Sequence, residues 1–243
     1  MVSHVPHEAK REKRRNGSTA KGMSEVMTLL YIHSVGSSEA SVLVESHATP
    51  ADRTRHIGAK AQQSVLGRAM VRRLIEDTTG LSGRDWIIKT DGNGRPFAVD
   101  IHGRPGPDFS ISHSGPWVAC AATDRGRIGI DIEVLGVDRS VQEIAATFFS
   151  PEEQDLIEIE GPTAFYDFWT IREAIGKADG GGLAAAMAVN GAALMGARHQ
   201  TSRLEMDGTC WSIHHSHRHG LSIALATTVM DGTWDMADGH EAQ

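Results

Sequence analysis

Two segments, one in each half of the chain, share a pattern that constrains the fold more than any other feature. Residues 114–123 (SGPWVACAAT) and 219–227 (HGLSIALAT) each pass from a glycine into a run of small and apolar residues. Such runs, next to a turn signal, are typical of buried strands. Their similarity predicts a duplicated unit.

Strand and helix patterns alternate through the first half. Apolar residues recur at helical spacing from Ile57 to Leu74, and Gly80 ends the pattern. The residues between Arg53 and Arg73 include six Lys or Arg and no acid, which predicts a positive surface patch. Strands are expected at Val26–Ser34, Trp86–Lys89, Phe109–Ser112 and Trp117–Thr123, with a turn at residues 91–94.

The second half follows the same alternation. Ser150, Pro151 and Glu153 form a capping-box signature at the start of a helix, which explains Glu153 structurally. A longer helix is expected at about Ala164–Asp179, because glycines 180–182 follow it. Closing strands are expected near Thr209–Ile213 and Leu221–Val229.

Composition limits the class of protein. The 243 residues are 40% hydrophobic and carry a formal net charge of −7. Two cysteines are too few for a disulfide framework, and no apolar run approaches the length of a membrane span. We therefore expect a cytoplasmic protein. Residues 1–25 are expected to be a disordered basic tail, and residues 233–243 a flexible acidic tail.

A short segment, Gly129–Glu133 (GIDIE), carries two carboxylates two residues apart. In a strand Asp131 and Glu133 lie on one face, while Ile130 and Ile132 point into the core. Neighbouring carboxylates repel unless a cation lies between them, so the pair fits a metal site. The pair fits a solvated strand face equally well.

The long second helix supplies further charged groups. Glu173 and Lys177 are four residues apart and share one face, which is also the spacing of a surface ion pair. Aromatic residues around them favour a packed helix. Asp131, Glu133 and Glu173 would together be able to hold Mg²⁺, and Lys177 would then contact a phosphate.

In order and spacing, several short motifs resemble the 4′-phosphopantetheinyl transferases of the surfactin-synthetase-activating (Sfp) type. The resemblance covers residues 27–230. The matching stretches are residues 94–97 (GRPF), 109–115 (FSISHSG), 129–133 (GIDIE), 148–153 (FFSPEE) and 169–183.

The resemblance implies an α/β (α+β) fold, a pseudo-twofold monomer of two similar halves, residues 26–124 and 125–232. It implies Mg²⁺, with Mn²⁺ as an alternative, and coenzyme A as co-substrate in the cleft between the halves. The reaction would transfer phosphopantetheine to a serine of an apo carrier protein and release adenosine 3′,5′-bisphosphate.

The resemblance also implies roles for individual residues. Asp131, Glu133 and Glu173 would be metal ligands. Glu173 would also accept the serine proton, and Lys177 would bind the pyrophosphate. His113 would contact the 3′-phosphate of coenzyme A. The expected cofactor-binding residues are Arg53, Arg55, Arg95, Pro96, Ser112, His113 and Lys177.

Three features depart from this pattern or lie outside it. Arg172 stands where the family has Lys, and Gln62 and Gln63 stand where relatives have a basic residue. The histidine-rich run at residues 214–219 is not interpreted as a metal site, because it lies in a predicted turn with no nearby carboxylate.

Two other functions remain open: a metal-dependent nuclease and a non-catalytic module that binds carrier proteins. The acidic body argues against nucleic acid, which normally requires a basic surface. The complete set of Asp131, Glu133, Glu173 and Lys177 argues against a purely binding module. The sequence does not identify the carrier protein.

Overall fold

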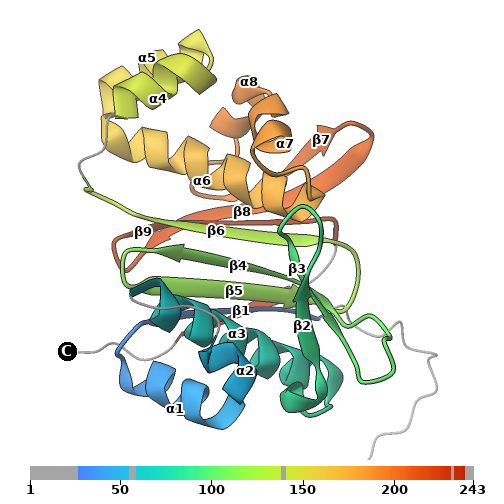
Figure 1. Ribbon diagram of the computed structural model, residues 1–243. Helices are drawn as coiled ribbons and strands as arrows, with labels where there is room; N and C mark the ends of the chain where they lie inside the picture. Colours follow the sequence, from blue (N-terminus) through green and yellow to red (C-terminus); the bar gives the residue numbers. More distant parts are fainter. Residues whose placement is uncertain (1–26, 55–58, 138–140, 231–232, 239–243) are drawn as a thin grey trace, which may run out of the picture.

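The computed structural model describes residues 27–54, 59–137, 141–230 and 233–238. Helices lie on the two outer sides and two four-stranded sheets lie between them (Figure 1). The first sheet has the strand order β10-β1-β5-β4 and the second β6-β9-β8-β7. The mixed α/β class expected from the sequence is confirmed. The expected basic tail, residues 1–25, lies outside the described residues.

The first sheet and its helices come mainly from the first half of the chain. The helix α3 and the hairpin β4–β5 agree with the sequence prediction, and the small β2–β3 hairpin turns at Gly94, where φ is +87°. The elements are β1 (Met27–Ser34), α1 (Ser38–His47), α2 (Pro50–Arg53), α3 (Ala59–Thr79), a 3₁₀ turn (Gly83–Asp85), β2 (Ile87–Thr90), β3 (Pro96–Val99), β4 (Asp108–Ser114) and β5 (Trp117–Thr123).

The second sheet follows in the chain. The predicted capping box at Ser150 and Glu153 is present at the start of α5, and Gly180 ends α6 in the left-handed conformation, with φ at +86°. The elements are β6 (Ile128–Val134), α4 (Val141–Phe148), α5 (Pro151–Glu160), α6 (Pro162–Asp179), α7 (Gly182–Ala188), α8 (Gly191–Met195), β7 (Thr201–Met206), β8 (Thr209–Arg218) and β9 (Leu221–Thr227).

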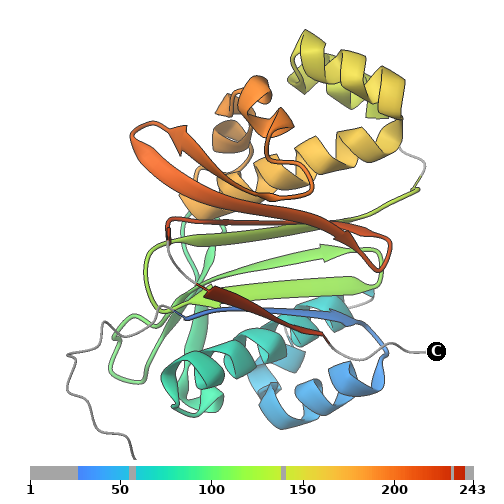
Figure 2. The same ribbon diagram turned by 180° about the vertical axis from the view of Figure 1, so that it is seen from behind.

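Residues 233–238, expected within a flexible tail, instead form the strand β10 (Thr233–Asp238). This strand pairs in parallel with β1, at the edge of the first sheet, as the rear view shows (Figure 2). Backbone pairing satisfies hydrogen-bonding groups along β1 that an open edge would expose. The acidic composition of the segment concealed this pairing, so the end of the chain completes the sheet of the first half.

The two sheets pack against each other through apolar side chains. The strands β5 and β9, which carry the similar segments, occupy equivalent central positions and both contribute to this contact. The outer face of each sheet packs on its own helices, mainly α3 and α6. The buried contact between the sheets consists of Leu30, Ile32, Ala119, Ala121, Ile128, Ile130, Ile132, Leu221, Ile223 and Leu225.

A buried ion pair joins α5 to α6. The guanidinium of Arg172 donates two hydrogen bonds to the Glu153 carboxylate, at 2.6 and 2.8 Å, and both side chains are almost fully buried. The guanidinium also stacks over the Phe149 ring at 4.6 Å. Glu153 therefore has the structural role that its capping position predicted, and Arg172 is its partner.

We expect Glu153→Gln to lower the free energy of unfolding by about 3–5 kcal/mol, because it leaves the buried Arg172 charge without a counter-ion. Urea denaturation would measure this loss. Glu158→Gln, an exposed change on the same helix, should alter stability by less than about 0.5 kcal/mol. Adding Arg172→Met to Glu153→Gln should recover part of the loss. A single variant as stable as the wild type would contradict the prediction.

Candidate active site

The strand β6 presents Asp131 and Glu133 toward α6, as the alternation predicted. Ile130 and Ile132 point the other way, into the contact between the sheets. Gly129 allows the close approach of α6, since a Cβ there would lie 2.0 Å from the Ala174 carbonyl oxygen. The absence of a side chain at residue 129 thus brings residues 173–177 of α6 over the two carboxylates.

Serine hydroxyls from β4 hold both carboxylates in place. Ser112 Oγ donates to Asp131 at 2.6 Å, and Ser114 Oγ donates to Glu133 at 2.8 Å. The same two oxygens accept backbone N–H groups from β6, at Ile132 and Val134. Each serine therefore joins the edge of β6 to an acidic side chain. Sequence reasoning missed Ser114, although the alternation of serines at 110, 112 and 114 matches the spacing of Asp131 and Glu133.

Lys177 on α6 completes this arrangement. Its Nζ donates to Asp131 at 2.6 Å and to Ser112 Oγ at 3.0 Å. Its side chain keeps 29% of its surface exposed, and it lines the neighbouring cavity. Lys177 is therefore tied to the carboxylates on one side and open to a ligand on the other.

Glu173 lies close enough to both carboxylates of β6 to be affected by their charge. Burial raises the pKa of Glu173, and the negative charges of Asp131 and Glu133 raise it further, while Lys177 opposes the shift. The structure thus brings together the three carboxylates and the lysine that the sequence singled out.

The residues fit a hard divalent cation. Asp131 Oδ2 is buried and has no hydrogen-bond partner, and the three carboxylates outnumber the nearby lysine. Oxygen-rich, negatively charged sites of this kind suit Mg²⁺. Their donor atoms are less tightly grouped than those of Asp167, His199 and His215, which all lie within 4.8 Å of one another elsewhere in the described chain.

A cavity of about 520 Å³ opens beside Lys177, between the two halves. Its walls come from the β2–β3 turn, from β4, and from the end of α6. It is large enough for an extended small molecule. The lining residues are Asn93, Gly94, Arg95, Pro96, Phe109, Ser110, Ile111, Gly176, Lys177, Gly180, Gly181 and Gly182.

Arg95 and Pro96, which were expected to bind the cofactor, line this cavity, but the guanidinium of Arg95 already binds other groups of the protein. It binds the Asp108 carboxylate at 2.8 and 2.9 Å and donates to the carbonyl oxygens of Lys177 and Ala178. Those carbonyls belong to the last turn of α6, where a cation is favourable. Arg95 therefore joins the first half of the chain to the end of α6, and it also lines the cavity.

Arg53, Ser112 and His113, which were also expected to bind the cofactor, are not among the residues that line this cavity. Ser112 binds Asp131 and Lys177, whereas His113, the next residue of β4, is exposed. Arg53 donates to the Val44 carbonyl oxygen and lines a different cavity of about 400 Å³. Arg55 lies outside the described residues. A contact of Arg53, Arg55 or His113 with a cofactor stays a prediction.

The predicted positive patch on α3 is largely neutralised. Arg72 is buried and binds Asp52 at 3.1 Å, and Arg68 lies 3.8 Å from the same carboxylate. Arg73 pairs with Asp77 at 2.8 Å. The prediction of a positive patch was wrong for these three arginines, because Asp52, just before the basic run, and Asp77, one helical turn after Arg73, pair with them.

Comparison with known proteins gives the class. Residues 127–228 match the family model described as the 4′-phosphopantetheinyl transferase superfamily, and residues 40–125 match the model of the N-terminal part of 4′-phosphopantetheinyl transferases. The first match covers the second sheet with its helices, and the second covers α3, β4 and β5 of the first half, whereas β1 and β10 lie outside both matches. The chain is therefore similar to such transferases along most of its length.

Individual relatives agree. The chain is 34% identical to the 4′-phosphopantetheinyl transferase psf-1 of Bacillus pumilus, over 73% of this chain and 70% of that protein. It is 38% identical to Sfp of Bacillus subtilis (strain 168), over 51% and 54% of the two chains, and 32% identical to gsp of Aneurinibacillus migulanus, over 53% of each. The chain belongs to the 4′-phosphopantetheinyl transferase family and is an enzyme of this family, of the Sfp type.

The repulsion around Glu173 predicts a gain in stability when its charge is removed. Folding raises the pKa of Glu173 above its ordinary value of 4.5. The free energy of unfolding therefore falls as the pH rises from 4.5 through the raised pKa of the folded state. Without divalent cations at pH 7, Glu173→Gln should therefore melt at a higher temperature than the wild type. Below pH 4.5, where both forms are neutral at this position, the difference should vanish.

Thermal unfolding in a chelator, followed by circular dichroism at several pH values, would test this. Glu205→Gln, an exposed carboxylate on β7, should show no comparable gain. A Glu173→Gln protein that melts at or below the wild-type temperature at pH 7 would show that Glu173 is not destabilised by its neighbours.

Proposed function

We propose that this enzyme transfers the 4′-phosphopantetheine group of coenzyme A to a serine hydroxyl of an apo carrier protein. The relatives named above are 4′-phosphopantetheinyl transferases. The observation that carries the proposal for this chain is Lys177, which contacts Asp131 and also faces the cavity between the halves. A pyrophosphate in that cavity would meet a cation next to a cluster of carboxylates.

The bond changes define what the site has to do. The serine oxygen forms a bond to the phosphorus that carries pantetheine, and the pyrophosphate bond to the other phosphorus breaks. Adenosine 3′,5′-bisphosphate leaves with the bridging oxygen. The serine proton must be removed, and negative charge on the leaving group must be neutralised. Catalysis of this kind depends on positioning and electrostatics.

Glu173 is the proposed proton acceptor, directly or through one water. Burial and the neighbouring charges raise the pKa of Glu173, which brings the carboxylate nearer to the operating pH of a general base. Lys177 Nζ is the proposed pyrophosphate contact, since it already lies at the wall of the cavity. Ser112 and Ser114 keep the carboxylates fixed while the substrate changes.

Asp131, Glu133 and Glu173 are the residues that would hold Mg²⁺. When bound, the ion would neutralise charge on the phosphates of the donor. The unpartnered, buried Asp131 Oδ2 supports this assignment. Mg²⁺, with Mn²⁺ as an alternative, is proposed as the ion from the resemblance. A monomer without nucleic-acid or membrane partners and a cytoplasmic location are proposed on the same basis. No helix in the described parts of the chain is long and apolar enough to cross a membrane.

The main test is a transfer assay. Incubation with coenzyme A, Mg²⁺ and an apo carrier domain should add one phosphopantetheine group to that domain, as measured by mass spectrometry. Asp131→Asn should reduce the rate by at least about 100-fold, because it weakens charge neutralisation at the reacting phosphates. Its circular dichroism spectrum should match that of the wild type.

Glu205→Gln serves as the matched control and should retain full activity, since Glu205 is exposed on β7, away from the carboxylate cluster. Wild-type activity in Asp131→Asn would refute the assignment of the metal site. Failure to modify any of several carrier domains would overturn the proposed reaction, and cleavage of DNA or RNA by the wild type would support a nuclease instead.

A second prediction concerns the donor. If His113 contacts the 3′-phosphate of coenzyme A, His113→Ala should raise the KM for coenzyme A by about 10-fold, the effect of losing one hydrogen bond to a charged group, with little change in kcat. The same variant should show a smaller change with 3′-dephospho-coenzyme A. His102→Ala, another exposed histidine, is the control. Equal effects on both donors would contradict a 3′-phosphate contact.

A further inference from the structure

The histidine-rich run at residues 214–219 does not form the turn that the sequence suggested. Most of it lies within the strand β8, where His215 and His217 point to the same side of the sheet, toward α6. The carboxylate that the sequence did not place nearby is Asp167, which projects from α6 and is fully buried. The earlier expectation that no carboxylate accompanies these histidines was therefore wrong.

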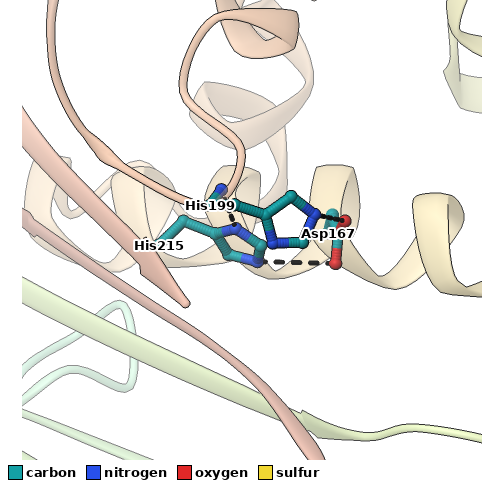
Figure 3. Close-up of side chains that lie close together, drawn as sticks. All are labelled: Asp167, His199 and His215. Carbon is teal, nitrogen blue, oxygen red and sulfur yellow. Dashed lines mark hydrogen bonds and ion pairs between the residues drawn. The ribbon is translucent and has the colours of Figure 1, made fainter. Parts of the chain in front are cut away.

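Three imidazoles surround this one carboxylate. His217 Nε2 lies 2.6 Å from Asp167 Oδ1, and His199 Nε2 lies 3.2 Å from Asp167 Oδ2. His215 Nε2 lies 3.5 Å from Oδ1 (Figure 3, where His217 is not drawn). The donor atoms of Asp167, His199 and His215 all lie within 4.8 Å of one another. Imidazole and carboxylate ligands at such spacing are typical of Zn²⁺ sites.

The backbone is arranged to bring His199 into this group. His199 adopts the left-handed conformation, with φ at +57°, which is uncommon for a residue other than glycine. In this conformation its side chain approaches Asp167, and its own N–H donates to His215 Nδ1 at 2.8 Å (Figure 3). A strained residue that is held in place by its neighbours is a common feature of ligand sites.

The hydrogen bonds distinguish ligands from supporting residues. Because His215 Nδ1 accepts the His199 N–H, the proton of neutral His215 is on Nε2, where it faces Ser222 and Asp167. His215 therefore orients the carboxylate and does not bind a metal in this arrangement. The Nε2 atoms of His199 and His217 remain as the two nitrogen ligands beside Asp167.

Charge also favours a cation here. Arg198 contacts Asp167 at 2.9 Å, but it is shared with Glu160, which lies 2.7 Å away. With the imidazoles neutral, one negative charge is left over in the group.

We propose that Asp167, His199 and His217 form a site for one divalent cation of the Zn²⁺ type, separate from the carboxylate cluster of the active site. Ligand atoms of a tetrahedral Zn²⁺ site are roughly 3.3 Å apart, from Zn–N and Zn–O bonds of about 2.0–2.1 Å. His199 Nε2 lies 3.2 Å from Asp167 Oδ2 and His217 Nε2 lies 2.6 Å from Oδ1, so each imidazole faces a different oxygen of the carboxylate, and ion binding would require the half-exposed His199 ring to turn toward a shared ion. Water can take the fourth position, because the His199 side chain is 50% exposed.

The bound ion would join three elements that the chain otherwise holds by hydrogen bonds: α6, the segment after α8, and β8. Asp167 lies six residues before Glu173, about 9 Å along the helix axis. The ion would therefore stabilise the helix that carries Glu173 and Lys177 without touching the reacting groups. Mg²⁺ would not compete strongly, since it prefers oxygen ligands.

Isothermal titration of the chelator-treated protein with Zn²⁺, with Mg²⁺ present in excess, tests the site. We expect one tight equivalent in the wild type and in Asp131→Asn, which leaves this site unchanged. His199→Gln and His217→Gln should each weaken binding by at least about 10-fold, as the loss of one ligand. His214→Gln is the matched control: this residue lies on the same strand with its side chain toward Thr201, and Zn²⁺ binding should be retained.

Substitution with Co²⁺ provides a readout that needs no variant. A four-coordinate site with nitrogen ligands should give the visible absorption bands of tetrahedral Co²⁺. These bands should be lost in His199→Gln. The side chain of His199 is half exposed, so this substitution should leave the fold intact. The proposal would be overturned if the wild type and both variants bound Zn²⁺ with equal affinity, or if the wild type did not bind Zn²⁺ tightly. The cluster would then be an ion-pair network without a metal. Transferase activity does not enter either readout.

Discussion

The rest of the structure depends on the contact between the edge of β6 and the serines of β4. There the serines of β4 accept the backbone N–H groups of Ile132 and Val134 and donate to Asp131 and Glu133. One row of hydroxyls thus joins the two sheets and fixes the acidic groups of the active site. Because the same atoms do both, the position of the carboxylates follows from the way the halves pack, and a shift between the halves would disturb the site.

A second contact reinforces this junction from the other end. Arg95 binds Asp108 and the last carbonyls of α6, and Asp108 in turn accepts the backbone N–H of Ile128 at the start of β6. The charged residues of the first half are therefore used to hold the second half. Arg95, which was expected to contact a cofactor, therefore uses its guanidinium to bind other groups of the protein. The cavity lies where the two halves meet.

Local patterns in the sequence predicted much of the fold and the centre of the site. The alternation in residues 129–133, the capping box at Ser150 and the helical spacing of Glu173 and Lys177 depend on nearest neighbours in the chain, and the structure agrees with each. The strand β10, the burial of Arg72 by Asp52 and the role of Ser114 were not predicted. Each depends on a partner distant in sequence, which local periodicity does not reveal.

The sequence by itself determined which groups are available: paired carboxylates on a strand, a glutamate and a lysine on one face of a helix, and a run of histidines. Only the tertiary structure decided what each group meets. It brings Glu173 and Lys177 over β6 because Gly129 has no side chain, and it places Asp167 among three histidines, two of which, His215 and His217, were expected in a turn. Electrostatic interactions fall off with distance in space, not along the chain, so the chemistry of these groups is fixed only when the chain has folded.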